Sequence, residues 1–339
     1  MRFLDADQVR AAAPMPLLLD AVEAAYRDVA AGRDQSPIRS RIPLGGGSLI
    51  LMPGMRAGGT RASVKLVTFM PDNASRGLPT IHAVVIVLDA ASGEPLAILD
   101  GATVTAMRTG AASGVGARLM ARLDAQVLSL FGVGAQAAWQ VRAVMAARPI
   151  RELRVFARTA SSRTAFAAQM AQELGAGVTV LAADSAENAV RGADIICCAT
   201  TSSQPIFSAD WVSPGTHVNA VGSFLLGMIE VPPELFARAE LVAVDSRVAA
   251  LEEAGDLVAA LEAGLLASDA LVEIGGIDRA WAAGRDASAI TLFKSVGLAI
   301  QDVATAELVM ATVAPGETAG GGMGGGGTAG DGTVSEVPG

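Results

Sequence analysis

The clearest chemical signal is a pair of glycines, Gly132 and Gly134, that follows the apolar run Val127–Phe131. A helix-forming run to Ala147 comes directly after them, so the order is strand, tight turn, helix. Backbone N–H groups at the start of such a helix can face a pyrophosphate, whose negative charge the helix dipole favours. The spacing Gly-x-Gly-x-x-Ala matches the dinucleotide-binding fingerprint with alanine as its third small residue. The motif predicts a dinucleotide site; the alternative is a tight turn without a ligand.

The segments after residue 126 favour the dinucleotide. Short apolar runs alternate there with helical segments, which is the pattern of a parallel, doubly wound sheet of the Rossmann type. The expected strands are Val127–Phe131, Leu153–Phe156, Val178–Leu181, Asp194–Ala199, His217–Val221 and Leu241–Val244. Because this is the fold in which a glycine turn binds a dinucleotide, the context supports the motif.

The first part of the chain has a different pattern. Residues 1–35 have helical spacing, and the following segment contains short extended runs separated by Gly, Pro, Asp and Asn, which predicts an antiparallel meander. These runs are Arg39–Leu44, Ser48–Met52, Ser63–Phe69, Ile81–Leu88 and Pro95–Leu99. A helix rich in Gly and Ala, from about Thr103 to Arg122, comes next, and its small residues allow close packing.

We therefore expect an α/β protein with a Rossmann domain and a smaller α+β domain for substrate binding and dimerisation. The smaller domain comprises residues 1–122 and 298–314, with a last helix that returns to it, and the Rossmann domain comprises 123–297. Residues 315–339 are mostly glycine, threonine and acidic residues, so we expect a disordered tail.

Charge and hydropathy argue against two classes of partner, nucleic acids and membranes. A net charge of -9 argues against nucleic acid, and no apolar run reaches the roughly 18 residues that span a bilayer. Acidic residues near the N-terminus and two adjacent cysteines, Cys197 and Cys198, favour a cytoplasmic location. No Cys/His cluster has metal-ligand spacing, and His82 and His217 lie in strand patterns, where we expect structural roles.

Eight short motifs in this order resemble the ornithine cyclodeaminase/mu-crystallin family over residues 1–313. They are Gly77-Leu-Pro-Thr-Ile-His-Ala83, Gly93-Glu-Pro-Leu-Ala97, Thr105-Ala-Met-Arg-Thr-Gly-Ala-Ala112, Gly132-Val-Gly-Ala-Gln136, Val218-Asn-Ala-Val-Gly-Ser-Phe224, Val244-Asp-Ser246, Glu253-Ala-Gly-Asp256 and Phe293-Lys-Ser-Val-Gly297. The resemblance implies a homodimer formed by pairing the sheets of the smaller domains. It also implies hydride transfer between a nicotinamide and the Cα of an amino or imino acid.

The resemblance also suggests site residues. Arg41 and Lys65 match substrate-carboxylate positions, and Lys65 is the candidate proton donor; two solvated charges on strands are the alternative. Arg108 is a lone charge in an apolar helix, where it must be paired, and it matches a cofactor position. The complete set of expected cofactor residues is Thr80, Arg108, Gly132, Gly134, Ala135, Gln136, Arg158, Thr159, Thr200, Val221 and Ser295.

The segment after the second Rossmann strand indicates which dinucleotide is used. NAD-binding folds usually have an acidic residue there, whereas this chain has Arg158 and Thr159, which suit a 2′-phosphate. We expect NADP(H) to be preferred, with NAD(H) possible. The counter-interpretation is a surface arginine near a helix start.

Phe224 narrows the reaction. Cyclodeaminases that resemble this chain have an aspartate at this position, and phenylalanine cannot exchange a proton. The expected activity is therefore the NAD(P)H-dependent reduction of a small α-imino acid such as Δ1-pyrroline-2-carboxylate, or the reverse amino acid dehydrogenase reaction. In the reductase and dehydrogenase branch of the family, a proline is usual at the position of Leu226 and a basic residue at that of Ile229, while Glu230 is kept. These two differences leave the side chain of the substrate open. The alternatives are ornithine cyclodeamination and a non-enzymatic ligand carrier like the crystallin member.

Overall fold

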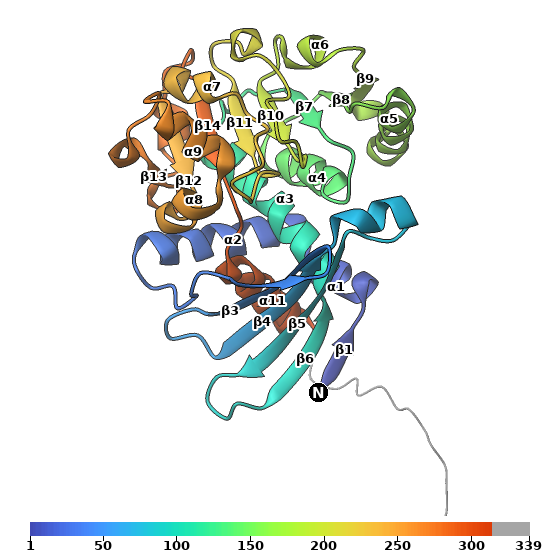
Figure 1. Ribbon diagram of the computed structural model, residues 1–339, viewed down its shortest axis with the longest axis vertical. Helices are drawn as coiled ribbons and strands as arrows, with labels where there is room; N and C mark the ends of the chain where they lie inside the picture. Colours follow the sequence, from blue (N-terminus) through green and yellow to red (C-terminus); the bar gives the residue numbers. More distant parts are fainter. Residues whose placement is uncertain (314–339) are drawn as a thin grey trace, which may run out of the picture.

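Two β-sheets organise the protein, whose computed structural model describes residues 1–313. In Figure 1 the eight-stranded sheet and its helices form the upper part, and the six-stranded sheet forms the lower part. The mixed α/β architecture with a Rossmann-like parallel sheet and a second sheet confirms the expected fold class. The expected tail, residues 315–339, lies outside the described residues.

The eight-stranded sheet has the order β13-β12-β14-β11-β10-β7-β8-β9, and its paired strands are parallel. The strands are β7 (Val127–Phe131), β8 (Glu152–Phe156), β9 (Thr179–Ala182), β10 (Ile195–Cys198), β11 (His217–Ala220), β12 (Leu241–Val244), β13 (Val272–Glu273) and β14 (Thr291–Lys294). The six strands expected from the sequence are present. The sequence analysis missed β13 and β14, although β14 lies between β11 and β12 in the middle of the sheet.

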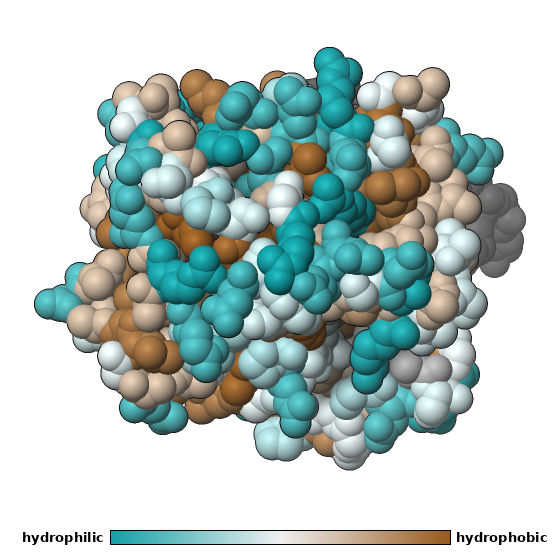
Figure 2. All heavy atoms as spheres, turned by 90° about the horizontal axis from the view of Figure 1, so that it is seen from above, coloured by the Kyte–Doolittle hydropathy of each residue, from teal (hydrophilic) through white to brown (hydrophobic). Residues whose placement is uncertain are grey.

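Helices connect and cover this sheet. They are α4 (Ala137–Ala147), α5 (Ala160–Leu174), α6 (Ala186–Val190), α7 (Pro233–Arg238), α8 (Arg247–Glu253), α9 (Gly255–Glu262) and α10 (Trp281–Gly284). At this end of the molecule hydrophilic residues interrupt the apolar ones across the surface, as Figure 2 shows. The central strands β10, β11 and β14 are fully buried, as expected for a parallel sheet covered on both faces, whereas the edge strand β9 is partly exposed.

The six-stranded sheet has the order β1-β6-β5-β4-β3-β2. Its strands are β1 (Arg2–Leu4), β2 (Ser40–Leu44), β3 (Gly47–Met55), β4 (Arg61–Phe69), β5 (Ile81–Asp89) and β6 (Pro95–Asp100). From β2 to β6 it is the predicted antiparallel meander. The expectation that residues 1–35 are helical is wrong at its start, because β1 pairs in parallel with β6 before α1 (Ala6–Ala12) and α2 (Met15–Ala30) begin. A three-residue strand is too short to show a period, and its partner is distant in sequence.

Two helices join the sheets. Buried helix α3 (Gly101–Met120) packs on α4 through Gly110 and Gly114, where an added Cβ would lie 2.5 Å from the carbonyl oxygen of Trp139 and 2.9 Å from that of Ala143. These glycines provide the close packing expected from the small residues. Helix α11 (Ala299–Thr312) leaves the eight-stranded sheet and packs on β3, β4 and α2, beside strands that are near the other end of the chain (Figure 1). We retain the division at residues 122 and 298 as a proposal.

Candidate active site

A cavity of about 240 Å³ lies between the two sheets. One wall comes from the inner face of the six-stranded sheet, and the opposite wall comes from the loops at the carboxyl ends of β7, β10, β11 and β14. Ligands of doubly wound sheets bind at that edge. Nine of the residues predicted from the sequence line this cavity: Lys65, Thr80, Arg108, Gly134, Ala135, Gln136, Thr200, Val221 and Ser295.

Lys65 is the most deeply buried charged group on the cavity wall. It lies on the inner face of β4, and only 1% of its surface is exposed. Its Nζ is 2.8 Å from Oδ1 and 2.7 Å from Oδ2 of Asp302, a fully buried residue of α11. The sequence analysis did not single out Asp302, because a polar residue in a predicted helix gives no sign of a partner on a distant strand.

The pKa of Lys65 is lowered to about 7. Burial is the main cause, because it penalises the charged ammonium, and the positive charge of Arg108 adds to it. Asp302 opposes both effects, since its carboxylate stabilises the ammonium. Lys65 is therefore balanced between its protonated and neutral forms near neutral pH, as suits a group that must release a proton and regain it.

Arg108 extends from α3 to the same carboxylate. Its Nε is 3.3 Å from Oδ1 of Asp302, and its Nη1 donates to Oε1 of Gln301 at 3.2 Å. The guanidinium lies against Gly297, where an added Cβ would be 2.2 Å from Nη1 and where φ is +83°. A glycine is thus required at position 297. Arg108 is both internally paired, as a buried charge must be, and part of the cavity wall.

Two arginines lie near the start of strand β2: Arg39 directly precedes the strand, and Arg41 is its second residue. Arg39 lines the cavity, its side chain is 8% exposed, and its Nε pairs with Oε1 of Glu253 at 3.0 Å. Arg41 lies at the exposed edge of the sheet, opposite Ile50, and its Nη1 donates to Oγ of Ser48 at 3.0 Å. The sequence analysis chose Arg41 and did not name Arg39. Positions 39 and 41 share one face of the strand by its two-residue period, which was the signal that could have indicated both.

The glycine turn has the geometry that the motif predicts. Gly132 has φ of +97°, and an added Cβ would lie 2.5 Å from the carbonyl oxygen of Ala199, so only glycine fits between β7 and β10. Helix α4 begins at Ala137, and its N-cap residue Gln136 makes no side-chain cap. Oε1 of Gln136 is buried without a hydrogen-bond partner among the described residues. An uncapped helix start and an unpartnered polar atom beside the cavity fit the phosphates of a dinucleotide.

Glu230 organises the loops that follow β10 and β11. Its Oε2 accepts from the backbone N–H of Thr200 and its Oε1 from that of Gly222, each at 3.3 Å. Burial raises the pKa of this carboxyl to about 8, although the Lys294 charge opposes the rise. The two loops place Thr200 and Val221 on the cavity wall.

Ser295 and Thr80 approach the cavity from opposite walls. Oγ of Ser295 donates to Oδ2 of Asp245 at 2.8 Å, and the same oxygen accepts from the N–H groups of Val296 and Gly297. These bonds fix the connection between β14 and α11. Thr80 precedes β5 and holds the Met70 N–H through its carbonyl oxygen at 2.8 Å.

Arg158 and Thr159 lie outside the lining of this cavity. Both are exposed at the end of β8, and Thr159 is the N-cap residue of α5 without a side-chain cap. Gly132 is the third predicted cofactor residue outside the lining; it packs against the backbone of Ala199.

Phe224 lines the cavity where the resemblance places the cyclodeaminase aspartate. Its ring packs edge-on against Phe69 of β4, with centroids 5.5 Å apart. Leu226 is 58% exposed, and Met228 is buried in the loop. This part of the wall is aromatic and supplies no titratable group.

Other candidate groups are structural. His217 is buried, its ring bonds Thr291 and Asn219, and burial lowers its pKa to about 3, so it stays neutral. Cys197 and Cys198 are buried free thiols, and burial raises the pKa of both. Within residues 1–313, no three His, Cys, Asp or Glu side chains are grouped to hold a metal ion. None of the helices in that part of the chain has the length and apolar character to span a bilayer.

Comparison with known proteins identifies the family of this chain. The family model for the ornithine cyclodeaminase/mu-crystallin family matches residues 2–317. A Delta(1)-pyrroline-2-carboxylate reductase from Bacillus cereus is 38% identical over 311 residues, which cover 91% of this chain and 95% of the relative.

Two solved structures are similar throughout. The Thermococcus litoralis Delta(1)-pyrroline-2-carboxylate reductase in complex with NADH and L-proline aligns with a TM-score of 0.85 and 32% identity, covering 92% of this chain and 97% of that chain. An archaeal alanine dehydrogenase dimer with bound NAD aligns with a TM-score of 0.83 and 31% identity, covering 92% and 95% of the two chains. The motifs, the fold and these similarities confirm the resemblance seen in the sequence: the chain belongs to the ornithine cyclodeaminase/mu-crystallin family.

Proposed function

We propose that the protein is an NAD(P)H-dependent reductase of small α-imino acids, with Δ1-pyrroline-2-carboxylate as the leading substrate. The observation that carries the proposal is the position of Lys65. This lysine, whose pKa is about 7, lies among cations on the same cavity wall that faces the dinucleotide turn. Relatives of this chain include Δ1-pyrroline-2-carboxylate reductases. The same machinery run backwards is an amino acid dehydrogenase.

The cations would hold the substrate carboxylate. Lys65 and Arg108 share Asp302, and Arg39 completes the positive wall, so a carboxylate entering here meets charge-assisted donors. We assign the carboxylate to Arg39 and Lys65, and keep Arg41 at the rim as a residue that guides it in. Fixing the carboxylate orients the adjacent C=N group, and such positioning contributes much of the rate in enzymes of this kind.

Lys65 would supply the proton. A reduced nicotinamide, when bound, supplies the hydride that forms the new C–H bond at the imine carbon. The imine nitrogen gains a proton, and Lys65 donates it from Nζ, either directly or through a water molecule. Asp302 then stabilises the ammonium when Lys65 takes a proton back from solvent. Phe69 and Phe224 form the apolar part of the wall, which favours a small substrate side chain.

Gly134, Ala135 and Gln136 would bind the pyrophosphate, and Thr200, Val221 and Ser295 would surround the nicotinamide end together with Thr80 and Arg108. The names of the solved relatives specify NADH or NAD. We propose a preference for NADP(H) in this chain, supported by the exposed Arg158 and Thr159 and by the absence of an acidic residue directly after β8. NAD(H) remains the second cofactor.

We also propose a homodimer. The face of the six-stranded sheet turned away from the helices has apolar side chains in register across its strands, such as Leu51, Leu66 and Val84, and Val84 is 40% exposed. A related alanine dehydrogenase is named as a dimer. Sedimentation velocity tests the proposal, since Val84→Glu should shift the protein towards monomer. The buried free cysteines support a reducing, cytoplasmic location, which fractionation of the native host would test.

Two other functions are distinguishable. Ornithine cyclodeamination lacks its expected carboxylate because Phe224 occupies that part of the wall. A ligand carrier would use the same cations without turnover. The test is a set of assays with purified protein: NADPH oxidation with Δ1-pyrroline-2-carboxylate, the same with pyruvate plus ammonium, and ammonia release from ornithine. Oxidation with an imino acid supports the reductase, ammonia release supports the cyclodeaminase, and binding without either reaction supports the carrier.

A further inference from the structure

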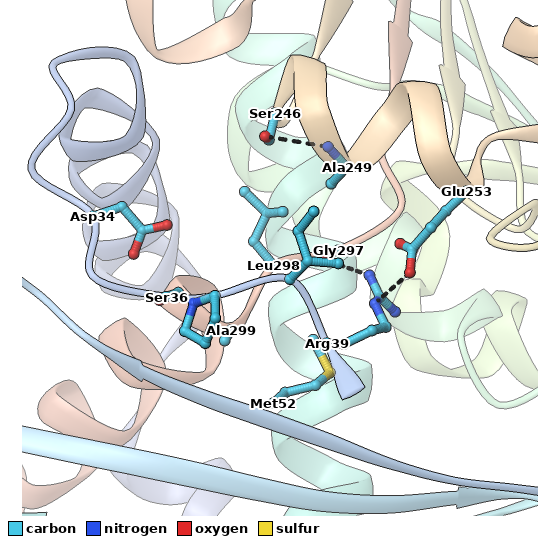
Figure 3. A pocket seen from close by; sticks show the side chains of 12 residues that line it. Asp34, Ser36, Arg39, Met52, Ser246, Ala249, Glu253, Gly297, Leu298 and Ala299 are labelled. Carbon is cyan, nitrogen blue, oxygen red and sulfur yellow. Dashed lines mark hydrogen bonds and ion pairs between the residues drawn. The ribbon is translucent and has the colours of Figure 1, made fainter. Parts of the chain in front are cut away.

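A smaller cavity lies directly behind Arg39, as seen in Figure 3. Its volume is about 60 Å³, and Arg39, Met52 and Gly297 line both cavities, so these three residues form the wall between them. Glu253, the last residue of α8, lines only the smaller one and pairs with Arg39 from that side. A carboxylate outside the larger cavity therefore holds one of its cations.

The hydrogen bonds of Arg39 occupy one edge of its guanidinium. Nε lies 3.0 Å from Oε1 of Glu253, and Nη2 donates to the carbonyl oxygens of Val296, at 2.9 Å, and Gly297. A two-point grip on an external carboxylate through Nε and Nη2 is thus already taken by the protein itself. Among the described residues Nη1 donates no hydrogen bond, so it is the nitrogen that can bind a ligand.

The charges of the wall match a single carboxylate. The cations lining the larger cavity are Arg39, Lys65 and Arg108. Asp302 pairs directly with Lys65 and Arg108, and Glu253 pairs with Arg39, which leaves one positive charge in excess when Lys65 is protonated.

Two further charged side chains near this wall, Asp245 and Arg41, do not line the larger cavity, so the charge count leaves them out. Oδ2 of Asp245 accepts hydrogen bonds from Ser295 and from two backbone N–H groups behind the wall. Burial raises the pKa of Asp245 and of Glu253, and the charge of Arg39 opposes the rise in both. Arg41 is exposed at the rim, where water screens its charge.

We propose that Glu253 is a positioning and specificity-determining residue: by holding and neutralising Arg39, it restricts the site to amino and imino acids with one carboxylate. The inference rests on the proposed function and names its substrate class. Without Glu253, Arg39 keeps its place through the backbone carbonyls but becomes an unpaired cation. A second carboxylate on the substrate would then find an unpaired cation in the wall, whereas in the native protein Glu253 already pairs with Arg39 from the smaller cavity.

Glu253→Gln tests this with two substrates that differ by one carboxylate. These are pyruvate plus ammonium and oxaloacetate plus ammonium, whose imines the enzyme would reduce with NADPH. The ratio of kcat/KM for the dicarboxylate over the monocarboxylate should rise about tenfold, the scale of one charged hydrogen bond. Glu253→Asp, which keeps the charge, should leave the ratio near that of the native protein.

The neighbouring Glu252 gives a matched control, because it is exposed on the same helix end. Glu252→Gln removes the same charge and should not change the ratio. The double variant Arg39→Gln/Glu253→Gln, which removes both members of the pair, should return the ratio to the native value. An unchanged ratio in Glu253→Gln, or an equal rise in Glu252→Gln, overturns the proposal.

A binding measurement separates this proposal from the reductase activity. Calorimetric titration with L-alanine and L-aspartate, in the presence of NADP⁺, compares the same two classes without turnover. Glu253→Gln should favour L-aspartate about tenfold relative to the native protein. If the native protein reduces no imino acid, the proposed function fails while this ratio still tests Glu253. An unchanged ratio, or no binding of either amino acid to any variant, contradicts the role of Glu253.

Discussion

Nζ of Lys65 lies 2.7 Å from Oδ2 of Asp302, and both side chains are buried in the wall between the two sheets. The pair joins β4 to α11 across 237 positions of sequence. It also contains the group with the most suitable pKa for proton transfer in the cavity, because Asp302 offsets part of the effect of burial on Lys65. A buried pair of this kind costs desolvation free energy, so its placement at the cavity suggests a role in the reaction.

Replacing Lys65 with methionine should lower kcat by roughly 10²-fold or more, because the variant keeps the length of the side chain and loses the proton donor. The affinity for NADPH, measured by fluorescence titration, should stay within about twofold of the native value, since the glycine turn is untouched. Arg61→Met, earlier on the same strand, is the control and should retain turnover. Full activity in Lys65→Met would show that another group provides the proton.

Asp302→Asn should change the pH dependence of kcat/KM. In the proposed mechanism Lys65 acts as an acid, so activity should fall as the pH rises through its pKa of about 7. Removal of the carboxylate leaves burial and Arg108, which both lower the pKa of Lys65, so the falling limb should move to lower pH. The measurement is a pH profile of imine reduction. Glu307→Gln on the same helix, which pairs with Arg56, should keep the native profile, and an upward shift in Asp302→Asn would contradict the assignment.

The two glycines of the turn should affect different properties: Gly132 the stability of the fold, and Gly134 the binding of the cofactor. Gly132→Ala should lower the melting temperature of the ligand-free protein, because it places Cβ 2.5 Å from a carbonyl oxygen at a φ of +97°. Gly134→Ala meets no atom within 4 Å, so its ligand-free melting temperature should be native. If Gly134 faces the pyrophosphate, the stabilisation by added NADPH should nevertheless decrease in this variant. Equal stabilisation in Gly134→Ala and in the native protein would place the phosphates elsewhere.

Arg158→Ala should raise the KM for NADPH about tenfold and leave the KM for NADH within about twofold, because only NADPH has a 2′-phosphate. Arg191→Ala, an exposed arginine paired with Glu187 outside the cavity, is the control. Steady-state kinetics with both cofactors check this. A higher kcat/KM for NADH than for NADPH in the native protein would refute the predicted preference.

Much of the fold could be read from the sequence where the signals are local. The glycine turn, five strands of the meander and six strands of the parallel sheet each have their own turn residues and apolar period. Strands β1 and β14 were missed for a physical reason. Thr291–Lys294 has two apolar residues between polar ends, and its burial depends on β11 and β12, which flank it from distant parts of the chain.

The site was predictable only in part. Arg108 and the glycine turn were named because they belong to motifs, and Lys65 because its position in the meander matches the family; the structure places them around one cavity. The predicted Arg158 and Thr159 lie outside its lining. Asp302 was not named, and Glu253 was quoted within a motif without a role, since a carboxylate in a helical pattern does not show which distant cation it will pair with. The choice between Arg39 and Arg41 depends on depth along one strand, which the alternation of side chains does not reveal.

Reduction of Δ1-pyrroline-2-carboxylate with NADPH that carries deuterium at both hydrogen positions of nicotinamide C4 tests the account most directly. It predicts proline with one deuterium at Cα, detected by mass spectrometry and NMR, and a matching loss of NADPH absorbance. If no proline forms with either cofactor and the protein binds neither NADPH nor NADH, the proposed reductase activity is contradicted.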